Sequence, residues 1–281
     1  MSAGRLLAAS RRSPLLGAGA AVLGLLVLAS CLAPWIVPYD PFAMDFHAKL
    51  VAPDWHHPFG TDALGQDILS RVIYGTRTSL VVGIAVVALA AGLGVPIGMV
   101  AGYFGGWVDA ALMRLTDVFL AFPPLLLPIS LTAALGPGLG NALMALGIAW
   151  FPWYARLVRS TTLAIRGEAF VTAAEGMGIG VVWILRKHIL PNALTPVLIQ
   201  ASMDFGYAIL AAASLSFIGI GARPPAIEWG LMVAMARAEF LDFWWTASFP
   251  GFAIFVTVLA VNLIGDGLRD LFDPKRAGVS A

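Results

Sequence analysis

The chain has 281 residues, of which 59% are hydrophobic and only 12% are charged. Soluble domains carry about 25% charged residues, so this composition, gathered in long apolar runs, predicts an all-α protein that crosses a membrane several times. The net charge of +1 gives no electrostatic basis for binding nucleic acid. The single cysteine, Cys31, excludes an internal disulfide.

The first membrane-spanning helix is predicted at residues 15–37. This run is mostly apolar and is long enough to cross a hydrocarbon core of about 30 Å. A twin-arginine signal at Arg11 and Arg12, or lipoprotein cleavage at Cys31, is the alternative, but the apolar run is longer than the core of a signal peptide. We interpret it as an uncleaved helix that forms, with the polar residues after it, an N-terminal unit covering residues 1–76.

Residues 38–78 form a polar segment, predicted outside the membrane, that contains five aspartates and the adjacent pair His56 and His57. Two adjacent side chains rarely point toward one ion, so a metal site at the pair is the lesser alternative and no metal is expected. The segment ends in an amphipathic helical pattern, with Ile68 and Val72 on one side.

Five further spans are predicted, which makes six in all: 79–100, 110–133, 140–158, 196–220 and 246–268. In the second span, Gly94, Gly98 and Gly102 recur every four residues and share a face, which favours close packing against another helix over a role in transport. The third span contains Pro123 and Pro124, which must kink or open it locally.

Two of these spans carry side chains that call for a specific environment. The fourth contains Trp150, Trp153 and Tyr154, which are typical of the aromatic belt at a membrane surface. The fifth contains Asp204 near mid-membrane, where a charge costs roughly 2.5–3.5 kcal/mol unless it is paired or hydrated. Asp204 is a candidate for the translocation path, where it would receive a cationic group. The alternatives are a hydrogen bond to a partner helix and simple protonation.

The loop at residues 167–196 is predicted to be a docking element rather than an ordinary connection, because most loops between helices are short. Glu168 to Met177 and Val181 to Leu190 both have helical character, and the glycines between them permit a bend. Pro191 is expected to end the second helix, because it lacks an N–H and disfavours helix in the residue before it.

The basic residues predict the orientation of the chain. With the N-terminus inside and six spans, twelve of the seventeen lysines and arginines lie in inside segments, and the outside segments hold the other five: Lys49, Arg71, Arg77, Arg223 and Arg237. The positive-inside rule therefore predicts that both termini and residues 160–192 are cytoplasmic.

Motifs of enzymes are missing from the sequence. There is no G-x-x-x-x-G-K-[ST] loop for nucleotide phosphates, so ATP and Mg²⁺ would have to be bound by another chain and no cofactor is expected in this one. There is also no G-x-S-x-G or H-E-x-x-H motif, which argues against a membrane protease.

The docking loop contains Ala173-Ala174, then Gly178, then Leu190-Pro191. On these residues it resembles the "EAA" loop of the membrane subunits of ATP-driven importers. Thr172 replaces the Glu of the motif, and His188 replaces its Ile. In that family the loop forms a cytoplasmic coupling helix that contacts an ATPase subunit. The resemblance therefore implies that the coupling loop comprises these positions: Thr172, Ala173, Ala174, Glu175, Gly178, His188 and Pro191.

Three further stretches sharpen the resemblance: AGYFGGWVD at 101–109, LSFIGIG with PP and EWG at 215–230, and FPG to DP at 249–274. Together with the loop and the segment at residues 60–80, they resemble the shorter of the two permease subunits in dipeptide and oligopeptide ABC importers, over about residues 55–276. Nickel and glutathione permeases share the same blocks, and a passive channel is a more distant alternative.

The resemblance implies a permease core at 77–276, followed by a tail at 277–281. It also implies a multi-pass subunit of the cytoplasmic (inner) membrane that works with a second homologous permease subunit, two ATPase subunits that bind ATP and Mg²⁺, and an external substrate-binding protein.

Overall fold

The computed structural model describes residues 14–272 and is built from helices, with no β-strand in that range. The all-α prediction is therefore confirmed. The helices are α2 (Pro14–Ile36), α3 (Ile68–Phe104), α4 (Gly106–Leu120), α5 (Leu126–Leu135), α6 (Leu139–Arg166), α7 (Ala169–Gly176), α8 (Val181–Ile184), the π-helical turn η1 (Leu185–Ile189), α9 (Leu190–Ile218), α10 (Trp229–Ala236) and α11 (Trp245–Phe272).

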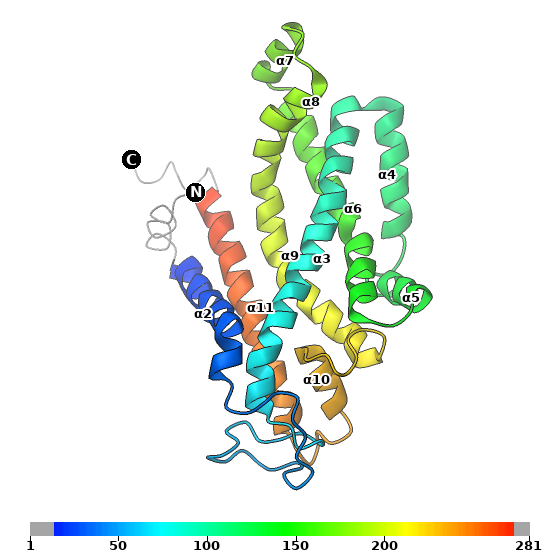
Figure 1. Cartoon of the computed structure of the whole chain (residues 1–281). Helices are drawn as coiled ribbons and strands as arrows, with labels where there is room; N and C mark the ends of the chain where they lie inside the picture. Colours follow the sequence, from blue (N-terminus) through cyan, green and yellow to red (C-terminus); the bar gives the residue numbers. More distant parts are fainter. Residues whose placement is uncertain (1–13, 273–281) are drawn as a thin grey trace.

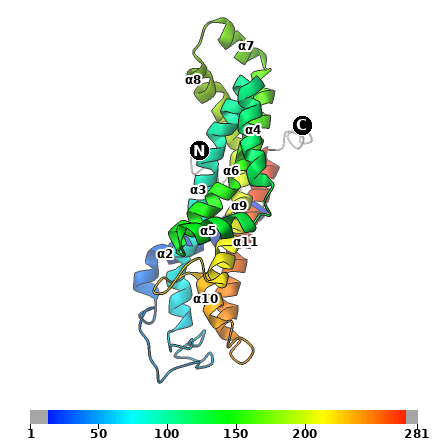
Figure 2. The same ribbon diagram turned by 90° about the vertical axis from the view of Figure 1, so that its right-hand side faces the viewer.

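The long helices lie roughly side by side and give the molecule two distinct ends (Figure 1). One end, here called the α7 end, holds α7, α8 and η1. The opposite end, the α10 end, holds residues 38–67 and α10, as the turned view in Figure 2 also shows. The start of α2 and the last turn of α11 both point toward the α7 end.

Helices α3 and α6 pack closely at the centre of the bundle through the predicted glycine stripe. A Cβ atom on Gly94 would lie 2.4 Å from the carbonyl oxygen of Phe151, and one on Gly98 would lie 2.4 Å from that of Ala155. No real Cβ approaches a backbone atom so closely, so only glycine permits this contact. The interpretation of the stripe as a packing face is confirmed.

The structure does not reproduce the six predicted spans with their predicted bounds. Among the described residues, four helical segments are long and apolar enough to cross a membrane: 14–36, 68–104, 181–218 and 245–270. The second of them is longer than predicted, because the amphipathic pattern after Asp67 and the apolar run after it form one helix. Helix α6 falls in the predicted fourth span, but its three arginines and its polar residues lower its hydropathy.

The predicted third span is two helices rather than one. Helix α4 ends at Leu120, and the chain turns through Pro123 and Pro124 before α5 begins at Leu126. Two consecutive prolines remove two N–H donors and disfavour helix before them, which explains the break. Pro128 lies in the first turn of α5, where the missing N–H has no intrahelical partner to lose.

The prediction that Pro191 ends a helix is wrong. The chain continues from α8 through η1 into α9, with Pro191 in the first turn of α9. In η1 the N–H of Leu190 bonds to the carbonyl of Leu185, five residues back. This wider turn accommodates a proline that would disrupt an ordinary helix at the same place.

The predicted aromatic belt is also wrong for two of its three members. Trp150 and Tyr154 are buried in the core between α3, α6 and α9, and only Trp153 is exposed. Both buried rings belong to the central helix of the bundle, so packing within the subunit accounts for them.

Candidate functional site

The loop between α6 and α9 has a small apolar core of its own. Val171 and Ala174 from α7 pack with Ile184 and Ile189, and Tyr103 from the last turn of α3 completes the cluster. The loop is therefore folded against the end of α3 instead of hanging free from two helices. This packing holds the predicted docking element in a fixed position at the α7 end.

Polar contacts strengthen the attachment of the loop to α3. The Tyr103 hydroxyl donates a hydrogen bond of 2.8 Å to Oε1 of Glu175. The Arg166 guanidinium, at the end of α6, lies over the Tyr103 ring at 5.4 Å. These contacts join α7 to the end of α3, and the end of α3 to the end of α6.

The predicted coupling residues differ in where their side chains point. Thr172, Ala173 and Glu175 are exposed on α7, but Ala174 is only 2% exposed and faces the loop's own core. The small size of Ala174 is therefore explained by packing inside the loop. Gly178 is exposed with φ at 73°, a left-handed conformation that favours glycine at this turn.

The second half of the loop places His188 and Pro191 around the π-helical turn. The His188 ring lies half-buried between Phe170, at 5.5 Å, and Trp183, at 5.0 Å. Its backbone carbonyl accepts a hydrogen bond of 2.6 Å from the side-chain amide of Asn192. His188 thus links the two halves of the loop through ring contacts, and the exposed Pro191 begins the long α9.

Sequence reasoning missed the exposed apolar residues of this loop. Met177 and Val182 are both largely exposed, and Trp183 is about half exposed. Val182 and Trp183 line a groove of about 540 Å³ together with Arg186 and Lys187. Large apolar side chains in an otherwise polar segment were the signal that could have identified this face.

Asp204 lies on α9 in the middle of the bundle and is half-buried. Its carboxylate accepts a hydrogen bond of 2.9 Å from the Gln200 side chain, one turn before it on the same helix. The buried Tyr154 hydroxyl of α6 lies close enough to interact with it, without a hydrogen bond of normal geometry. Ala208 and Ala212 continue the same face of α9 into the apolar core.

Residues 94–278 match the family described as the binding-protein-dependent transport system inner membrane component. Residues 9–53 match the N-terminal transmembrane domain of oligopeptide transport permease C. The chain belongs to the family of binding-protein-dependent transport permeases. The resemblance noted from the sequence motifs is confirmed.

Curated relatives match this permease over most of their length. The probable D,D-dipeptide transport system permease protein DdpC of Escherichia coli is 45% identical, over 95% of this chain and 89% of the relative. The dipeptide transport system permease protein DppC of Alkalihalophilus pseudofirmus is 44% identical, over 91% and 86%. The glutathione transport system permease protein GsiD of Escherichia coli is 43% identical, over 90% and 84%.

Solved structures share the fold of the permease. The methionine ABC transporter MetNI, in an inward-facing conformation, matches with a TM-score of 0.58 and 19% identity, over 72% of this chain and 96% of the other. An amino acid ABC transporter with histidines matches with a TM-score of 0.54 and 16% identity, over 72% and 94%.

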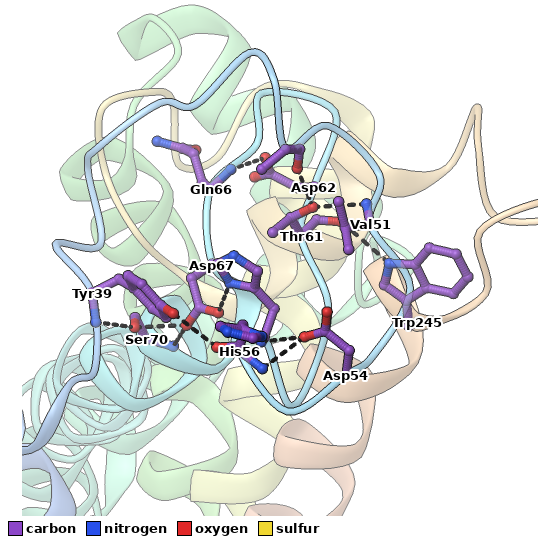
Figure 3. A network of polar contacts seen from close by, with 12 residues as sticks. Tyr39, Val51, Asp54, His56, Thr61, Asp62, Gln66, Asp67, Ser70 and Trp245 are labelled. Atoms are coloured by element: carbon purple, nitrogen blue, oxygen red, sulfur yellow. Dashed lines mark hydrogen bonds and ion pairs between the residues drawn. The ribbon is translucent and has the colours of Figure 1, made fainter.

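At the α10 end of the permease, residues 38–67 have no helix and are ordered by carboxylates. Five aspartates each accept a hydrogen bond from the backbone N–H of a residue two to four positions later: Asp40, Asp45, Asp54, Asp62 and Asp67. Side chains of this kind replace the backbone pairing that a helix or sheet would supply. Figure 3 shows part of this network.

Asp67 is the central member of the network, because it also caps α3. Its buried carboxylate accepts hydrogen bonds from the backbone N–H of Ser70 at 2.8 Å and from the Ser70 hydroxyl at 2.7 Å. Nδ1 of His57 lies 2.9 Å from its other oxygen. Within residues 14–272, no three His, Cys, Asp or Glu side chains gather as metal ligands. The contact with Asp67 gives His57 a partner within the protein.

Two further aspartates of the segment have pKa values displaced in opposite directions. Burial raises the pKa of Asp62, although hydrogen bonds from the N–H groups of Gln66 and Leu64 and the charge of Arg71 oppose this. The backbone N–H of His57 lowers the pKa of Asp54, which is fully exposed. Asp54 therefore stays ionised, as its hydrogen bonds require.

Proposed function

We propose that this permease belongs to an ATP-driven importer that moves dipeptides or oligopeptides across the cytoplasmic membrane. The observation that carries the proposal is the 45% identity, over 95% of the chain, with a D,D-dipeptide permease. The complete importer would contain a second homologous permease subunit, two ATPase subunits and an external binding protein. ATP and Mg²⁺ would be bound by the ATPase subunits, and this chain would bind no cofactor.

The coupling step of the proposal uses the α7–η1 loop. Its outer face combines exposed apolar side chains with Arg186 and Lys187, a composition suited to a protein groove. Its inner face is fixed to α3 by the apolar cluster and by the hydrogen bond from Tyr103 to Glu175. Closure of the ATPases would therefore move a firmly attached element and bias the bundle between outward and inward access.

The substrate has one alternative with support of its own. A glutathione permease is 43% identical to this chain, and glutathione is itself a peptide. No observation on this chain favours the other two alternatives, nickel transport and a passive channel.

Transport by the reconstituted complex tests the proposal. The permease, its partner subunits and its binding protein are placed in proteoliposomes, and uptake of labelled dialanine is measured. We expect uptake that requires both ATP and the binding protein. Uptake of glutathione but not dialanine would favour the alternative substrate, and uptake without ATP would contradict an importer.

We also infer that the α7 end is cytoplasmic and the α10 end external, as the distribution of basic residues predicts. Residue 50 lies in the segment between α2 and α3, and residue 180 lies between α7 and α8. These two segments are at opposite ends of the molecule (Figure 1). Single cysteines at these positions, in a Cys31→Ser background, are expected to react with an impermeant thiol reagent from opposite sides of the membrane. Labelling of both from one side would contradict this topology.

For Asp204 we propose two roles that one variant separates. The path hypothesis has Asp204 receive a cationic group of the substrate, and the positioning hypothesis has it join α9 to α6 beside Tyr154. Asp204→Asn keeps the size and the hydrogen bond to Gln200 but removes the charge. Loss of basic-peptide uptake with normal assembly supports the path role. Equal uptake of basic and neutral peptides supports the positioning role.

A further inference from the structure

The most exposed large apolar side chain of the described residues is at the α10 end. Trp55 is 99% exposed, in the middle of the polar segment between α2 and α3. An indole carries a large apolar surface, and leaving all of it in water forgoes the free energy that burial would provide. Phe42, Met44 and Phe46 of the same segment are also exposed, and several exposed large apolar side chains in one polar segment mark a contact with another molecule.

Trp55 is held on a rigid turn. The Asp54 carboxylate accepts hydrogen bonds from the backbone N–H groups of His56 at 2.8 Å and His57 at 2.6 Å. The backbone N–H of Asp54 donates to the carbonyl of His57 at 3.0 Å, which closes the turn around Trp55.

This turn is also fixed to the ends of two long helices, α2 and α3. The His57 ring lies tilted against the ring of Tyr39, just beyond α2, with the ring centroids 4.7 Å apart, and its Nδ1 lies beside Asp67, the N-cap of α3. The Tyr39 hydroxyl donates to the carbonyl of His56 at 3.0 Å. The backbone at Trp55 therefore loses little conformational freedom on binding, which lowers the cost of using its side chain as an interface anchor.

The surroundings of Trp55 favour a protein partner over the lipid surface. The exposed charges of the segment itself are Asp40, Asp45 and Asp54 against the single Lys49, so its own surface is acidic. Anionic headgroups are repelled by such a surface, whereas a protein with basic residues around an apolar cleft is attracted.

We propose that the Trp55 turn is the anchor on which the external binding protein docks. The partner surface is an apolar cleft for the indole with lysines or arginines at its rim. The inference rests on the binding-protein dependence of the family and on the proposed orientation, and it holds for any solute the binding protein carries.

The position of α3 gives the docking site a mechanical consequence. Asp67 caps this helix at the turn, and Tyr103 near its other end holds Glu175 of the α7–η1 loop. A helix of 37 residues is about 55 Å long. One continuous element thus joins the anchor to the loop, and docking is expected to stimulate ATP hydrolysis through it.

A docking titration tests the anchor. The complete transporter is placed in lipid nanodiscs, and the Kd of its binding protein and the stimulation of ATP hydrolysis are measured. Trp55→Ala is expected to raise Kd at least tenfold and to reduce the stimulation at binding-protein concentrations below the new Kd, with basal hydrolysis and gel-filtration elution unchanged. Trp35→Ala is the matched control, because Trp35 is also a largely exposed tryptophan, at 78%, but lies on α2. A Kd for Trp55→Ala within twofold of wild type overturns the proposal.

Photo-crosslinking separates the protein partner from lipid. Trp55→Cys in a Cys31→Ser background is labelled with a benzophenone maleimide and irradiated with saturating binding protein. An adduct with the binding protein supports the anchor, and adducts only with lipid or with another subunit of the transporter overturn it. Both tests measure docking of the binding protein and do not depend on which solute it carries. A negative result therefore contradicts the anchor without contradicting peptide transport, and a negative result in the uptake assay contradicts peptide transport without contradicting the anchor.

Discussion

The two ends of the permease are ordered by different physical means. At the α7 end, the loop between α6 and α9 folds into short helices around an apolar cluster that includes Val171 and Ile184. At the α10 end, residues 38–67 contain no helix, and aspartate carboxylates that accept backbone N–H groups determine their path. The first arrangement depends on burial of apolar side chains, and the second on directed hydrogen bonds.

The difference suits the two kinds of contact we propose. A loop that transmits force needs an internal core, because a packed cluster moves as one body. A loop that presents a side chain to a visiting protein needs only a fixed outline, which short turns of Asp and its neighbours provide. Helix α3 connects the two arrangements, with Asp67 at one end and Tyr103 near the other.

The largest effect is expected from a substitution at the centre of α3, the helix that connects the two ends. Gly98→Leu places a Cβ 2.4 Å from the carbonyl oxygen of Ala155, a backbone atom that cannot move away freely. We expect a loss of about 1–3 kcal/mol or more, a large part of the stability of a folded domain. The yield of monodisperse protein and its Tm in detergent measure this. Gly92→Leu on the same helix is the control, because no atom lies within 4 Å of its added Cβ. Equal Tm values for the two variants would contradict the packing argument.

A second substitution tests the turn at the α7 end. Gly178→Leu meets no atom within 4 Å, but its φ of 73° costs a side-chain-bearing residue about 1–2 kcal/mol. We expect the subunit to insert normally while substrate-stimulated ATP hydrolysis and transport fall together. Gly176→Leu, at an open helical position of the same loop, controls for bulk. Normal transport by Gly178→Leu would show that the loop is not the coupling element.

Much of the fold was predictable from apolar runs, because a membrane span needs length and hydrophobicity and little else. Helices α2, α9 and α11 begin and end within a few residues of their predicted spans, apart from the start of α9. The glycine stripe was predictable for a similar reason, since three glycines at helical spacing have few other uses. The coupling-loop helix α7 also lies where Ala-rich sequence predicted it.

The remaining features depend on tertiary context that a pattern does not contain. Pro191 continues a helix because a π-helical turn precedes it, and such a turn has no sequence signature of its own. The inward direction of Ala174 depends on the end of α3 lying beneath it. Trp150 and Tyr154 matched an interfacial belt, but α6 is the central helix, so its aromatic residues are buried. The sequence shows the five aspartates of residues 38–67, but their hydrogen bonds depend on the path of the backbone, which only the structure shows.

A third substitution sharpens the comparison by separating the loop from α3. Tyr103→Phe removes the hydroxyl that donates to Glu175 and leaves the ring in the apolar cluster. A hydrogen bond to a carboxylate contributes about 1.5–3 kcal/mol, and less where solvent competes for the carboxylate. Because Glu175 is exposed, we expect the loss of free energy to fall in the lower part of this range or below it. Hydrogen exchange over residues 169–189 is expected to quicken several-fold. Tyr74→Phe, near the other end of α3, is the control and should leave this region unchanged. Unaltered exchange in Tyr103→Phe would mean that the apolar cluster alone fixes the loop.

The smallest effect is expected at the turn around Trp55, where acceptor and charge can be separated. Asp54→Asn keeps an oxygen that can accept from the N–H groups of His56 and His57, whereas Asp54→Ala removes it. Hydrogen exchange of residues 51–60 should therefore quicken several-fold in the alanine variant and change little in the asparagine variant.

The hydrogen bonds to Asp54 also lower the pKa of its carboxyl in the folded protein. A lowered carboxyl pKa adds stability that is present above the pKa of the unfolded chain and is lost as pH falls through the lower, folded value. Wild-type protection, corrected for the intrinsic exchange rate, is thus expected to stay constant from pH 7 to about pH 5, above the usual carboxyl range. A decline within that interval would mean that a group other than Asp54 titrates there, and equal exchange in the two Asp54 variants would show that the carboxylate does not order this turn.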